Sequence, residues 1–578
     1  MKINIYFFIA FILACVAFVG DSIIYFLKLS YSIAMLISFF ITIISLYYCI
    51  KKKIFIVTFD FDRSDTFLFV AMFFTTIMSG IVYPDYTYDT VAYHEYLQST
   101  PFIDKINFDF FPGRIFCTFL FPLGDRMYYI IRILFGYRVG MILSFFSIIV
   151  VFYQIKNILK LLTNQQKISS IITYAILLLV SFITNIGTYY IDNICIMFTL
   201  QVLYFILNNE DILKNKYKLY IITLISGIAI GIKITQVFFI IPLYIYMILK
   251  NKKDFKEINL VTILVCAILI LIPYITYLVD NFIQTGSILF PYYNSILKSE
   301  YYQEINWIDE RFNIHGIINY LFWPVIKGFT HSYYGDERPF IDPLFGIAYL
   351  FTIINFIYCL VAKRKDTIFE MTILALINYW LWMLFMKGYF RYGIFVGILF
   401  CIIMFANIVN IVSHCIIHKI KIKISFKISF ISLLIYEIIT GLLLLFFVCD
   451  FDNGKYIFKD IDNKSHKISI DGVWGAPKDC TVFVSLVREE DTPIYCLHRE
   501  YFEGTEKTLK MWEEKIKNND IYTIIDYYGG NFSQNHRVKS LKEDGFEIED
   551  VIKSYTVDEI PYTNSHSRWV LVKLKYVE

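Results

Sequence analysis

The distribution of charged residues is the feature of this sequence that most constrains its fold. Between Ile3 and Val448, apolar stretches of roughly 17–25 residues recur, separated by short polar segments. Each stretch is long enough to cross a hydrocarbon layer of about 30 Å at about 1.5 Å per residue. Of the 578 residues, 57% are hydrophobic and 19% are aromatic, which is more than a soluble domain carries. The sequence therefore predicts an α-helical polytopic membrane protein.

The apolar stretches predict about thirteen transmembrane helices. The pairs 169–208 and 218–249 leave this number open by about one or two. The expected spans lie at approximately 4–26, 31–50, 66–82, 127–153, 169–188, 190–208, 218–232, 234–249, 259–279, 342–362, 368–386, 391–412 and 428–449.

Basic residues predict the orientation of these spans, because cytoplasmic loops carry an excess of Lys and Arg. With a cytoplasmic N-terminus and an odd number of spans, the basic clusters all fall in the cytoplasm. The loops 83–126 and 280–341 and the tail after residue 449 then lie outside. An even number would place the tail in the cytoplasm. The clusters are Lys51–Lys53, Lys156, Lys160 and Lys167, Lys214, Lys216 and Lys218, Lys250, Lys252 and Lys253, Lys363–Lys365, and Lys419, Lys421, Lys423 and Lys427.

The chain divides into three expected parts: an N-terminal transmembrane hairpin (1–65), a larger transmembrane part (66–449) that contains the external loops 83–126 and 280–341, and an extracytoplasmic α/β domain (450–578). In the third part, segments 480–487, 493–498, 521–528 and 567–577 have strand patterns, and 506–518 has a helical one. This part contains no GxGxxG or P-loop sequence, so nucleotide binding is not expected.

The eleven cysteines contain no CxxC pair and no metal-like Cys/His spacing, so neither a zinc site nor a redox motif is predicted. A disulfide between Cys480 and Cys496 depends on an oxidising compartment and stays open.

The first external loop opens with the densest polar cluster near a membrane surface, YPDYTYDTVAYHEYLQS (83–99). Asp85 and Asp89 lie one helical turn apart, and either side chain can serve as a base or bind a cation. Tyr93 and His94 lie in the same segment. The alternative is an interfacial belt, in which tyrosines sit at the membrane boundary and the carboxylates are simply solvated.

Other charged residues are expected at the same membrane face. Asp192 and Lys233 lie at external turns between spans, and Arg391 begins an apolar span. Arg114 and Arg126 either extend toward lipid headgroups or hold a phosphate in a bidentate grip. Ionisable groups at such places are functional candidates by default. Together they suit a substrate with a phosphate at the headgroup level and a hydroxyl-rich part beyond it.

Two short motifs resemble the GT-C glycosyltransferase superfamily, in particular its bacterial mannosyltransferase-like and arabinosyltransferase-like members. One subgroup carries Asp-[Ser/Thr]-x-x-Tyr-His in an early external loop, and this chain reads DTVAYH at 89–94. A later loop of the subgroup carries Gly-Asn-Pro-x-x-Pro-[Phe/Tyr]-[Phe/Tyr]-Asn, and this chain reads GSILFPYYN at 286–294, without the Asn-Pro. Asp192, Lys233 and the Arg391–Tyr392 pair resemble further features of the subgroup.

The resemblance covers roughly residues 66–400. It departs from the family pattern in two ways: two extra spans precede the acidic loop, where the superfamily usually has one, and there is no adjacent Asp/Glu pair. The resemblance implies a GT-C-like fold and transfer of a sugar from a polyprenyl-phosphate carrier to a cell-envelope glycan or lipid. The reaction would occur at the outer face of the bacterial cytoplasmic membrane.

In this interpretation Asp89, with Asp85 nearby, carries the catalysis as a general base or by orienting the acceptor hydroxyl. No metal site is predicted, although a divalent cation on Asp85 and Asp89 stays open. Apart from the donor, the acceptor and membrane lipids, no partner is expected, and in particular no nucleic acid. The substrate-binding residues would be Tyr93, His94, Arg114, Asp192, Lys233, Tyr292, Asn294 and Arg391.

Three other classes share the apolar spans. A transporter or flippase for lipid-linked sugars needs a cationic cavity but no catalytic acid, and it often shows internal repeats, which are not seen here. A polymerase of lipid-linked saccharides would carry its main residues in a large external loop, such as 280–341. A non-catalytic membrane protein would bind a partner through its tail.

Overall fold

The structure is a computed structural model. It describes residues 1–59, 61, 63–66, 69–70, 89, 93–94, 97–98, 119, 121–136, 138–165, 170–209, 211–306, 314, 316–330, 341–417, 435, 467–470, 494–496, 505–507, 510, 521–528, 536–543, 545–555 and 567–577. The expected spans 66–82 and 428–449 lie almost entirely outside these ranges.

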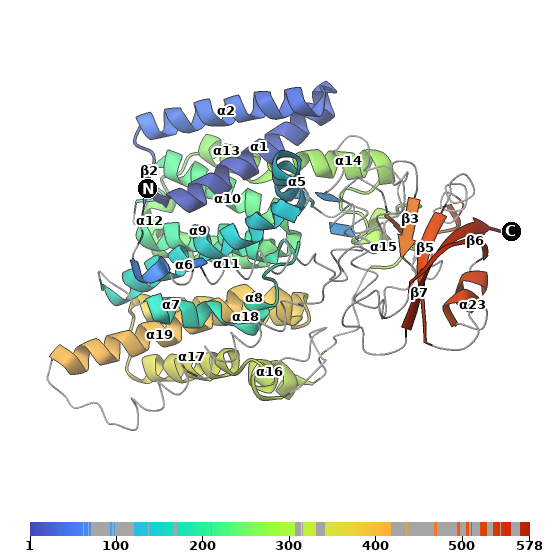
Figure 1. The fold of residues 1–578 in the computed structure, drawn as a ribbon. Coiled ribbons are helices and arrows are strands. Elements are labelled where there is room, and N and C mark those ends of the chain that lie inside the picture. Colours follow the sequence, from blue (N-terminus) through green and yellow to red (C-terminus); the bar gives the residue numbers. More distant parts are fainter. Residues whose placement is uncertain are drawn as a thin grey trace.

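Helices form the larger body of the molecule, and the N-terminus lies at the end of this body that is remote from the C-terminal sheet (Figure 1). The principal helices are α1 (Ile5–Leu27), α2 (Tyr31–Lys51), α5 (Leu123–Phe135), α6 (Ile142–Thr163), α7 (Ser170–Leu177), α8 (Val180–Ile183), α9 (Asp192–Asn208), α10 (Lys216–Ile232), α11 (Val237–Lys250), α12 (Lys252–Phe255), α13 (Leu260–Leu271), α14 (Ile275–Thr285), α15 (Asn294–Leu297), α16 (Ile317–Phe329), α17 (Pro343–Val361), α18 (Thr367–Phe385) and α19 (Ile394–Ile417).

The chain is a multi-pass membrane protein. Within the described ranges, six helices are long and apolar enough to cross a membrane, and a seventh span forms if the bent pair α13–α14 is one unit. The helices α9 and Ile234–Lys250 are apolar but shorter. The helical, polytopic character is therefore confirmed, whereas the expected number of about thirteen spans stays a prediction.

The expected span 127–153 is wrong as a single helix. Helix α5 ends at Phe135, and Gly136 follows with φ +92°, a backbone conformation that ends a right-handed helix. The span begins again near Val139 and continues to Thr163. Because the residues on both sides of Gly136 are apolar, hydropathy alone did not reveal this break.

Two further expected spans are interrupted. The span 169–188 is divided between α7 and α8. At this break the Leu178 amide donates to the carbonyls of both Tyr174 and Ala175, which tightens the last turn of α7. The span 259–279 bends by 64° between α13 and α14. Pro273 lies at this bend, where its missing amide hydrogen and its ring disfavour a continuous helix.

A buried polar contact ties the first helix to later ones. Asp21 of α1 accepts hydrogen bonds from Arg126 Nε of α5 at 3.1 Å and from the Tyr277 hydroxyl of α14 at 2.8 Å. Next to this contact, the hydroxyls of Ser22 in α1 and Thr276 in α14 lie 2.7 Å apart. The N-terminal hairpin is thus joined to later helices through α1. Within the N-terminal part itself, strand β1 (Lys2–Asn4) pairs in parallel with β2 (Ile56–Thr58).

The C-terminal part contains a five-stranded sheet with the order β4-β3-β5-β7-β6. The bounds are β3 (Lys467–Ile470), β4 (Ile494–Cys496), β5 (Ile521–Tyr528), β6 (Phe546–Tyr555) and β7 (Ser567–Tyr576), with helix α23 (His536–Glu543) before β6. Strand β3 runs parallel to β4 and β5, whereas β7 runs antiparallel to β5 and β6.

Three expected strands coincide with β4, β5 and β7, while 480–487 and most of the expected helix 506–518 lie outside the described residues. Strands β3 and β6 were not expected. Strand β6 has an irregular pairing. Its register against β7 shifts between Ile548 and Asp550 and again between Val551 and Lys553. These bulges break the alternation of apolar and polar residues on which strand recognition depends.

Candidate functional site

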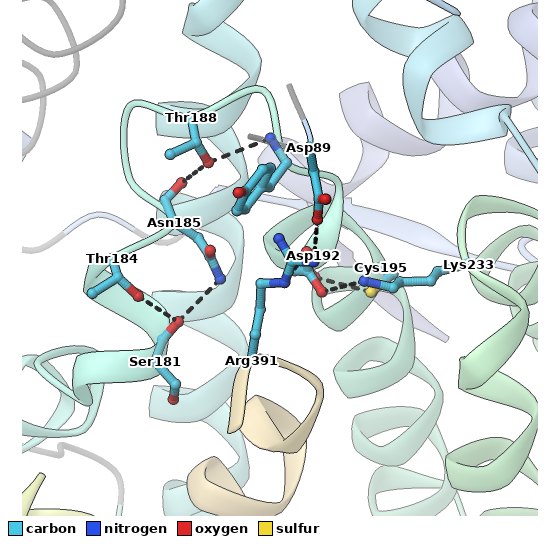
Figure 2. A network of polar contacts seen from close by, with 10 residues as sticks. Asp89, Ser181, Thr184, Asn185, Thr188, Asp192, Cys195, Lys233 and Arg391 are labelled. Atoms are coloured by element: carbon cyan, nitrogen blue, oxygen red, sulfur yellow. Dashed lines mark hydrogen bonds and ion pairs between the residues drawn. The ribbon is translucent and has the colours of Figure 1, made fainter. Parts of the chain in front are cut away.

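Three helix ends bring charged residues together. Asp192 is the first residue of α9, Lys233 follows the last residue of α10, and Arg391 lies in the 3₁₀ turn η7 (Phe390–Gly393) that leads into α19. Lys233 Nζ lies 2.6 Å from Asp192 Oδ1, and Arg391 Nε lies 3.8 Å from Asp192 Oδ2. Arg391 also forms an ion pair with Asp89 of the first loop. Figure 2 shows these side chains converging from separate segments.

The two carboxylates and two cations of this cluster are largely removed from solvent. Asp89 is 6% exposed, Asp192 3% and Arg391 9%. Charges at such depth are stable only when they are paired, since the low dielectric penalises each isolated charge by several kcal/mol. The cluster is neutral as a whole, so an added anion must displace or share one of the existing pairs.

Tyrosine rings surround the two cations. The Arg391 guanidinium carbon lies 4.2 Å from the Tyr190 ring centroid, 5.4 Å from that of Tyr389 and 5.6 Å from that of Tyr392. Lys233 Nζ lies 4.0 Å from the Tyr392 ring centroid. These faces attract the cations without satisfying their hydrogen-bonding capacity. The sequence indicated the Arg391–Tyr392 pair, but Tyr190 carried no recognisable signal.

Several polar atoms at the cluster have no hydrogen-bond partner among the described residues. They include Arg391 Nε and Nη1, Asp192 Oδ2, and both amide atoms of Asn193. Asn193 is 2% exposed. Leaving a buried polar group unsatisfied costs about 1–3 kcal/mol, and more if it is charged. Such atoms therefore form a set of donors and acceptors available to a ligand.

A hydrogen-bonded turn before α9 positions Tyr190 and Asp192 (Figure 2). Asn185 Nδ2 donates to the Ser181 carbonyl at 3.0 Å, and the Thr188 hydroxyl donates to the Asn185 carbonyl at 2.9 Å. The Thr188 hydroxyl also accepts from the Tyr190 amide at 3.3 Å. These bonds fix the backbone that carries the Tyr190 ring against Arg391.

A second polar group lies beside this cluster. His94 Nδ1 is 2.8 Å from Asp125 Oδ1, and Gln98 Nε2 donates to the same oxygen at 2.7 Å. The His94 ring packs 4.2 Å from the Tyr93 ring and 5.9 Å from the Tyr190 ring. Asp125 was not among the predicted site residues, because its Leu-Gly-Asp context was interpreted as an interfacial turn.

The structure thus brings together four of the predicted residues, Asp89, Asp192, Lys233 and Arg391, with Tyr93 and His94 adjacent. Their catalytic and binding roles stay predictions. Asp85 and Arg114 lie outside the described residues. Arg126, expected at the same face, is paired with Asp21 as described above.

Tyr292 lies in the turn between α14 and α15, and Asn294 is the first residue of α15. The Asn294 side chain forms its hydrogen bonds with the loop that follows this helix. Its Nδ2 donates to the carbonyls of Ser299, Tyr302 and Gln303, and its Oδ1 accepts from the Ser299 amide at 2.7 Å. With these bonds made, the Asn294 side chain has little capacity left for a substrate.

No group of three or more His, Cys, Asp or Glu in the described part of the chain is arranged to hold a metal ion. Since Asp85 lies outside that part, the arrangement of Asp85 and Asp89 toward a cation stays open.

Comparison with known proteins gives a match over part of the chain. The sequence model of the dolichyl-phosphate-mannose-protein mannosyltransferase family matches residues 127–277. No curated protein matches the chain. Among solved structures, ArnT from Cupriavidus metallidurans bound to undecaprenyl phosphate is similar with 11% identity and a TM-score of 0.40, over 88% of this chain and 97% of that one. The matched segment contains Asp192 and Lys233, and over these residues the chain is similar to that mannosyltransferase family.

Proposed function

We propose that the protein transfers a sugar from a polyprenyl-phosphate carrier to a cell-envelope glycan or lipid at the outer face of the cytoplasmic membrane. The observation that carries this proposal is the buried cluster of Arg391, Asp89, Asp192 and Lys233, with unused guanidinium N–H groups. The matched family supports the donor class, because its name describes a sugar carried on a polyprenyl-type phosphate.

Arg391 suits the phosphate of such a carrier. A guanidinium presents a planar fork of donors that matches two phosphate oxygens, and two of its nitrogens make no hydrogen bond among the described residues. Lys233 adds a second positive charge next to it through Asp192. As the bond between sugar and phosphate breaks, negative charge grows on the leaving phosphate, and preorganised cations stabilise that charge most strongly in a buried site.

Donor binding then changes the state of Asp89. In the structure this carboxylate is engaged by Arg391, and the negatively charged phosphodiester of a bound donor competes for the same guanidinium. Asp89 is thereby released to accept a hydrogen bond from the acceptor and to orient it toward the sugar. The cluster thus favours an order in which the donor binds before the acceptor is engaged.

Contacts of the C-terminal part support its placement on the side of the second external loop. The Thr505 hydroxyl donates to the Glu300 carbonyl at 2.7 Å, and Lys507 forms an ion pair with the Glu300 side chain. Two segments in contact lie on one side of a membrane. This supports an odd number of spans and an extracytoplasmic tail, near enough to the loop to help recognise an acceptor.

The test is product formation by purified protein supplied with polyprenyl-phosphate mannose or polyprenyl-phosphate arabinose and a membrane-derived glycan acceptor. Wild type is compared with Asp89→Asn and Arg391→Lys. We expect each variant to lose about 10²–10³-fold in kcat, because one charged contact to the reacting groups is removed or misplaced.

Measuring how tightly each variant binds polyprenyl phosphate distinguishes the role of Asp89 in the reaction from the role of Arg391 in holding the carrier. Asp89→Asn should keep carrier affinity, whereas Arg391→Lys should weaken it. Arg364→Lys is the matched control, since Arg364 pairs with Asp366 on the exposed surface. Equal turnover by wild type and Asp89→Asn would remove Asp89 from the chemistry. Lipid translocation without any transfer by wild type would instead favour a transporter.

A further inference from the structure

We propose that His94, held by Asp125, accepts the proton of the acceptor hydroxyl during sugar transfer. Asp125 is the positioning residue, and His94 Nε2 is the atom that receives the proton. This inference rests on the proposed function and deepens it. It names the group that accepts the proton of the acceptor hydroxyl, a role that the Asp89–Arg391 pair does not fill.

Asp125 is held firmly enough to orient a ring. It is 1% exposed and lies in the first turn of α5, where the helix dipole favours a negative charge. Gln98 donates to its Oδ1 at 2.7 Å and to the Tyr189 carbonyl at 3.0 Å. Arg132 Nη1 in turn approaches Gln98 Oε1 at 3.4 Å. The carboxylate is therefore fixed by His94 and Gln98, and Gln98 is held in turn by Tyr189 and Arg132.

This geometry selects one tautomer of His94. A carboxylate can only accept, so the 2.8 Å contact with Asp125 requires a hydrogen on Nδ1. In the neutral ring Nε2 then carries the lone pair and can accept a proton. A carboxylate that fixes the tautomer and stabilises the imidazolium is the arrangement by which buried Asp–His pairs assist proton transfer in hydrolases.

The His94 imidazole also lies beside the charged cluster, with Tyr190 between the two. Tyr93 and His94 occupy a π-helical turn, a local widening of the helix that is frequent at functional sites. The His94 ring faces Tyr190, and the other contacts of Tyr190 include the Arg391 guanidinium at 4.2 Å. One tyrosine thus separates the proton acceptor from the cation assigned to the phosphate.

Asp89 is less suited to take the proton. An aspartate carboxylate ordinarily titrates near pH ~4, so it is a weak proton acceptor at neutral pH. An imidazole ordinarily titrates near neutral pH, which is where a general base is most effective. We therefore assign orientation of the hydroxyl to Asp89 and acceptance of its proton to His94.

The atoms and electrons balance in one displacement. The acceptor oxygen forms a bond to the anomeric carbon of the sugar while the bond from that carbon to the phosphate oxygen breaks. The electron pair of the broken bond stays on the phosphate, next to Arg391 and Lys233. The hydroxyl proton passes to His94 Nε2, Asp125 stabilises the imidazolium, and the proton later leaves to water.

The groups around the ring decide its orientation. Among the described residues, Asp125 of α5 faces Nδ1, Tyr93 lies beside the ring, and Tyr190 lies between it and the Arg391–Asp89 pair. Replacing Asp125 by a residue that cannot accept from Nδ1 should therefore remove the contact that keeps Nε2 free to accept a proton.

The experiment measures kcat/KM for transfer from polyprenyl-phosphate mannose against pH, for wild type, His94→Gln, Asp125→Asn and Asp125→Glu in the full-length protein. In wild type, activity should fall at acidic pH, because a protonated base cannot accept the hydroxyl proton. His94→Gln should lose about 10²–10⁴-fold and lack this acidic limb of the pH profile. Asp125→Asn should lose activity, because the tautomer of His94 is no longer fixed, and Asp125→Glu should recover part of that activity.

A structural role is separated by a control and a second measurement. Asp65→Asn removes another fully buried carboxylate, paired with Lys156, and should lower thermal stability without moving the acidic limb. Polyprenyl phosphate should bind all variants with wild-type affinity. An acidic limb that persists in His94→Gln, or wild-type activity in Asp125→Asn, overturns the role of His94 while leaving the proposed transfer intact. Absence of transfer by wild type overturns both.

Discussion

Asp65 and Asp211 illustrate how burial sets the value of an ion pair in this molecule. Asp65 is 0% exposed; Lys156 Nζ lies 3.1 Å from its Oδ1, and the Ser170 hydroxyl donates to the same oxygen at 2.5 Å. Asp211 pairs with Lys218 at 2.6 Å, but its side chain is 52% exposed. Water screens the second pair and not the first.

We predict that Asp65→Asn lowers the free energy of unfolding by about 3–5 kcal/mol, because Lys156 keeps an uncompensated charge. Asp211→Asn should cost less than about 1 kcal/mol after allowance for solvent screening. Thermal unfolding in detergent measures both. Equal losses in the two variants would contradict the argument from burial.

The hydrogen bond from Lys218 also lowers the pKa of Asp211. Because the folded-state pKa lies below the unfolded one, the small stabilisation from this pair is present above the ordinary aspartate range. It is lost as the pH falls through the folded-state value. The wild-type and Asp211→Asn proteins should therefore differ slightly near neutral pH and converge in acid.

At the level of residues, the sequence indicated the charged members of the site but not their partners. Asp89, Asp192, Lys233 and Arg391 stood out because ionisable groups are costly near a bilayer. Tyr190 and Asp125 did not, since tyrosine is common at membrane boundaries and an aspartate in a Leu-Gly-Asp turn has a simple explanation. Their importance arises from contacts between segments distant in the chain, which no local pattern contains.

Among the helices, α10 and α13 approach each other most closely at Gly227. A Cβ atom at this position would lie 2.4 Å from the Ile270 carbonyl oxygen, which belongs to the backbone of α13. Small residues allow such close contact between membrane helices, where van der Waals packing provides much of the association energy. One turn later, Gly231 would meet the Leu123 side chain at 3.2 Å.

Gly227→Ala should therefore lower the thermal midpoint, with a loss of about 1–3 kcal/mol as the two backbones are forced apart. Gly231→Ala is the matched control on the same helix. It should be close to neutral, because a side chain can move and alanine favours a helix over glycine by about 0.5–1 kcal/mol. If Gly231→Ala lowered the thermal midpoint more than Gly227→Ala, the contact between Gly227 and the α13 backbone would not determine stability here.

Elements were predictable where an apolar run and a helix coincide, as in α1, α2, α17 and α18. They were not predictable where a backbone feature interrupts the run, as Gly136 does between α5 and α6 and as Pro273 does between α13 and α14. Hydropathy reports how apolar a segment is. It does not report whether one hydrogen-bonded helix continues through that segment.

At the scale of the whole molecule, the contact of Thr505 and Lys507 with Glu300 leads to a test of topology. We predict that a membrane-impermeant thiol reagent applied to intact cells labels Lys507→Cys and Glu300→Cys but not Lys252→Cys. Lys252 lies in a basic loop assigned to the cytoplasm. Permeabilised cells should label all three, and wild type gives the background from native cysteines. Labelling of Lys252→Cys in intact cells would reverse the assigned orientation.

The Asp21 contact joins parts of the molecule that the ribosome makes at very different times. Helix α1 has a mean hydropathy of 2.5, enough to enter the bilayer although it carries a carboxylate in its last third, and a carboxylate at the centre of such a helix costs about 2.5–3.5 kcal/mol. Its partner Arg126 is synthesised 105 residues later, and Tyr277 is synthesised 256 residues later. Throughout that interval the nascent chain holds an acidic group without its final partners. Insertion of this protein therefore requires the first helix to remain near the insertion machinery until the later helices emerge, and chains truncated before Arg126 should be recognised by membrane quality control.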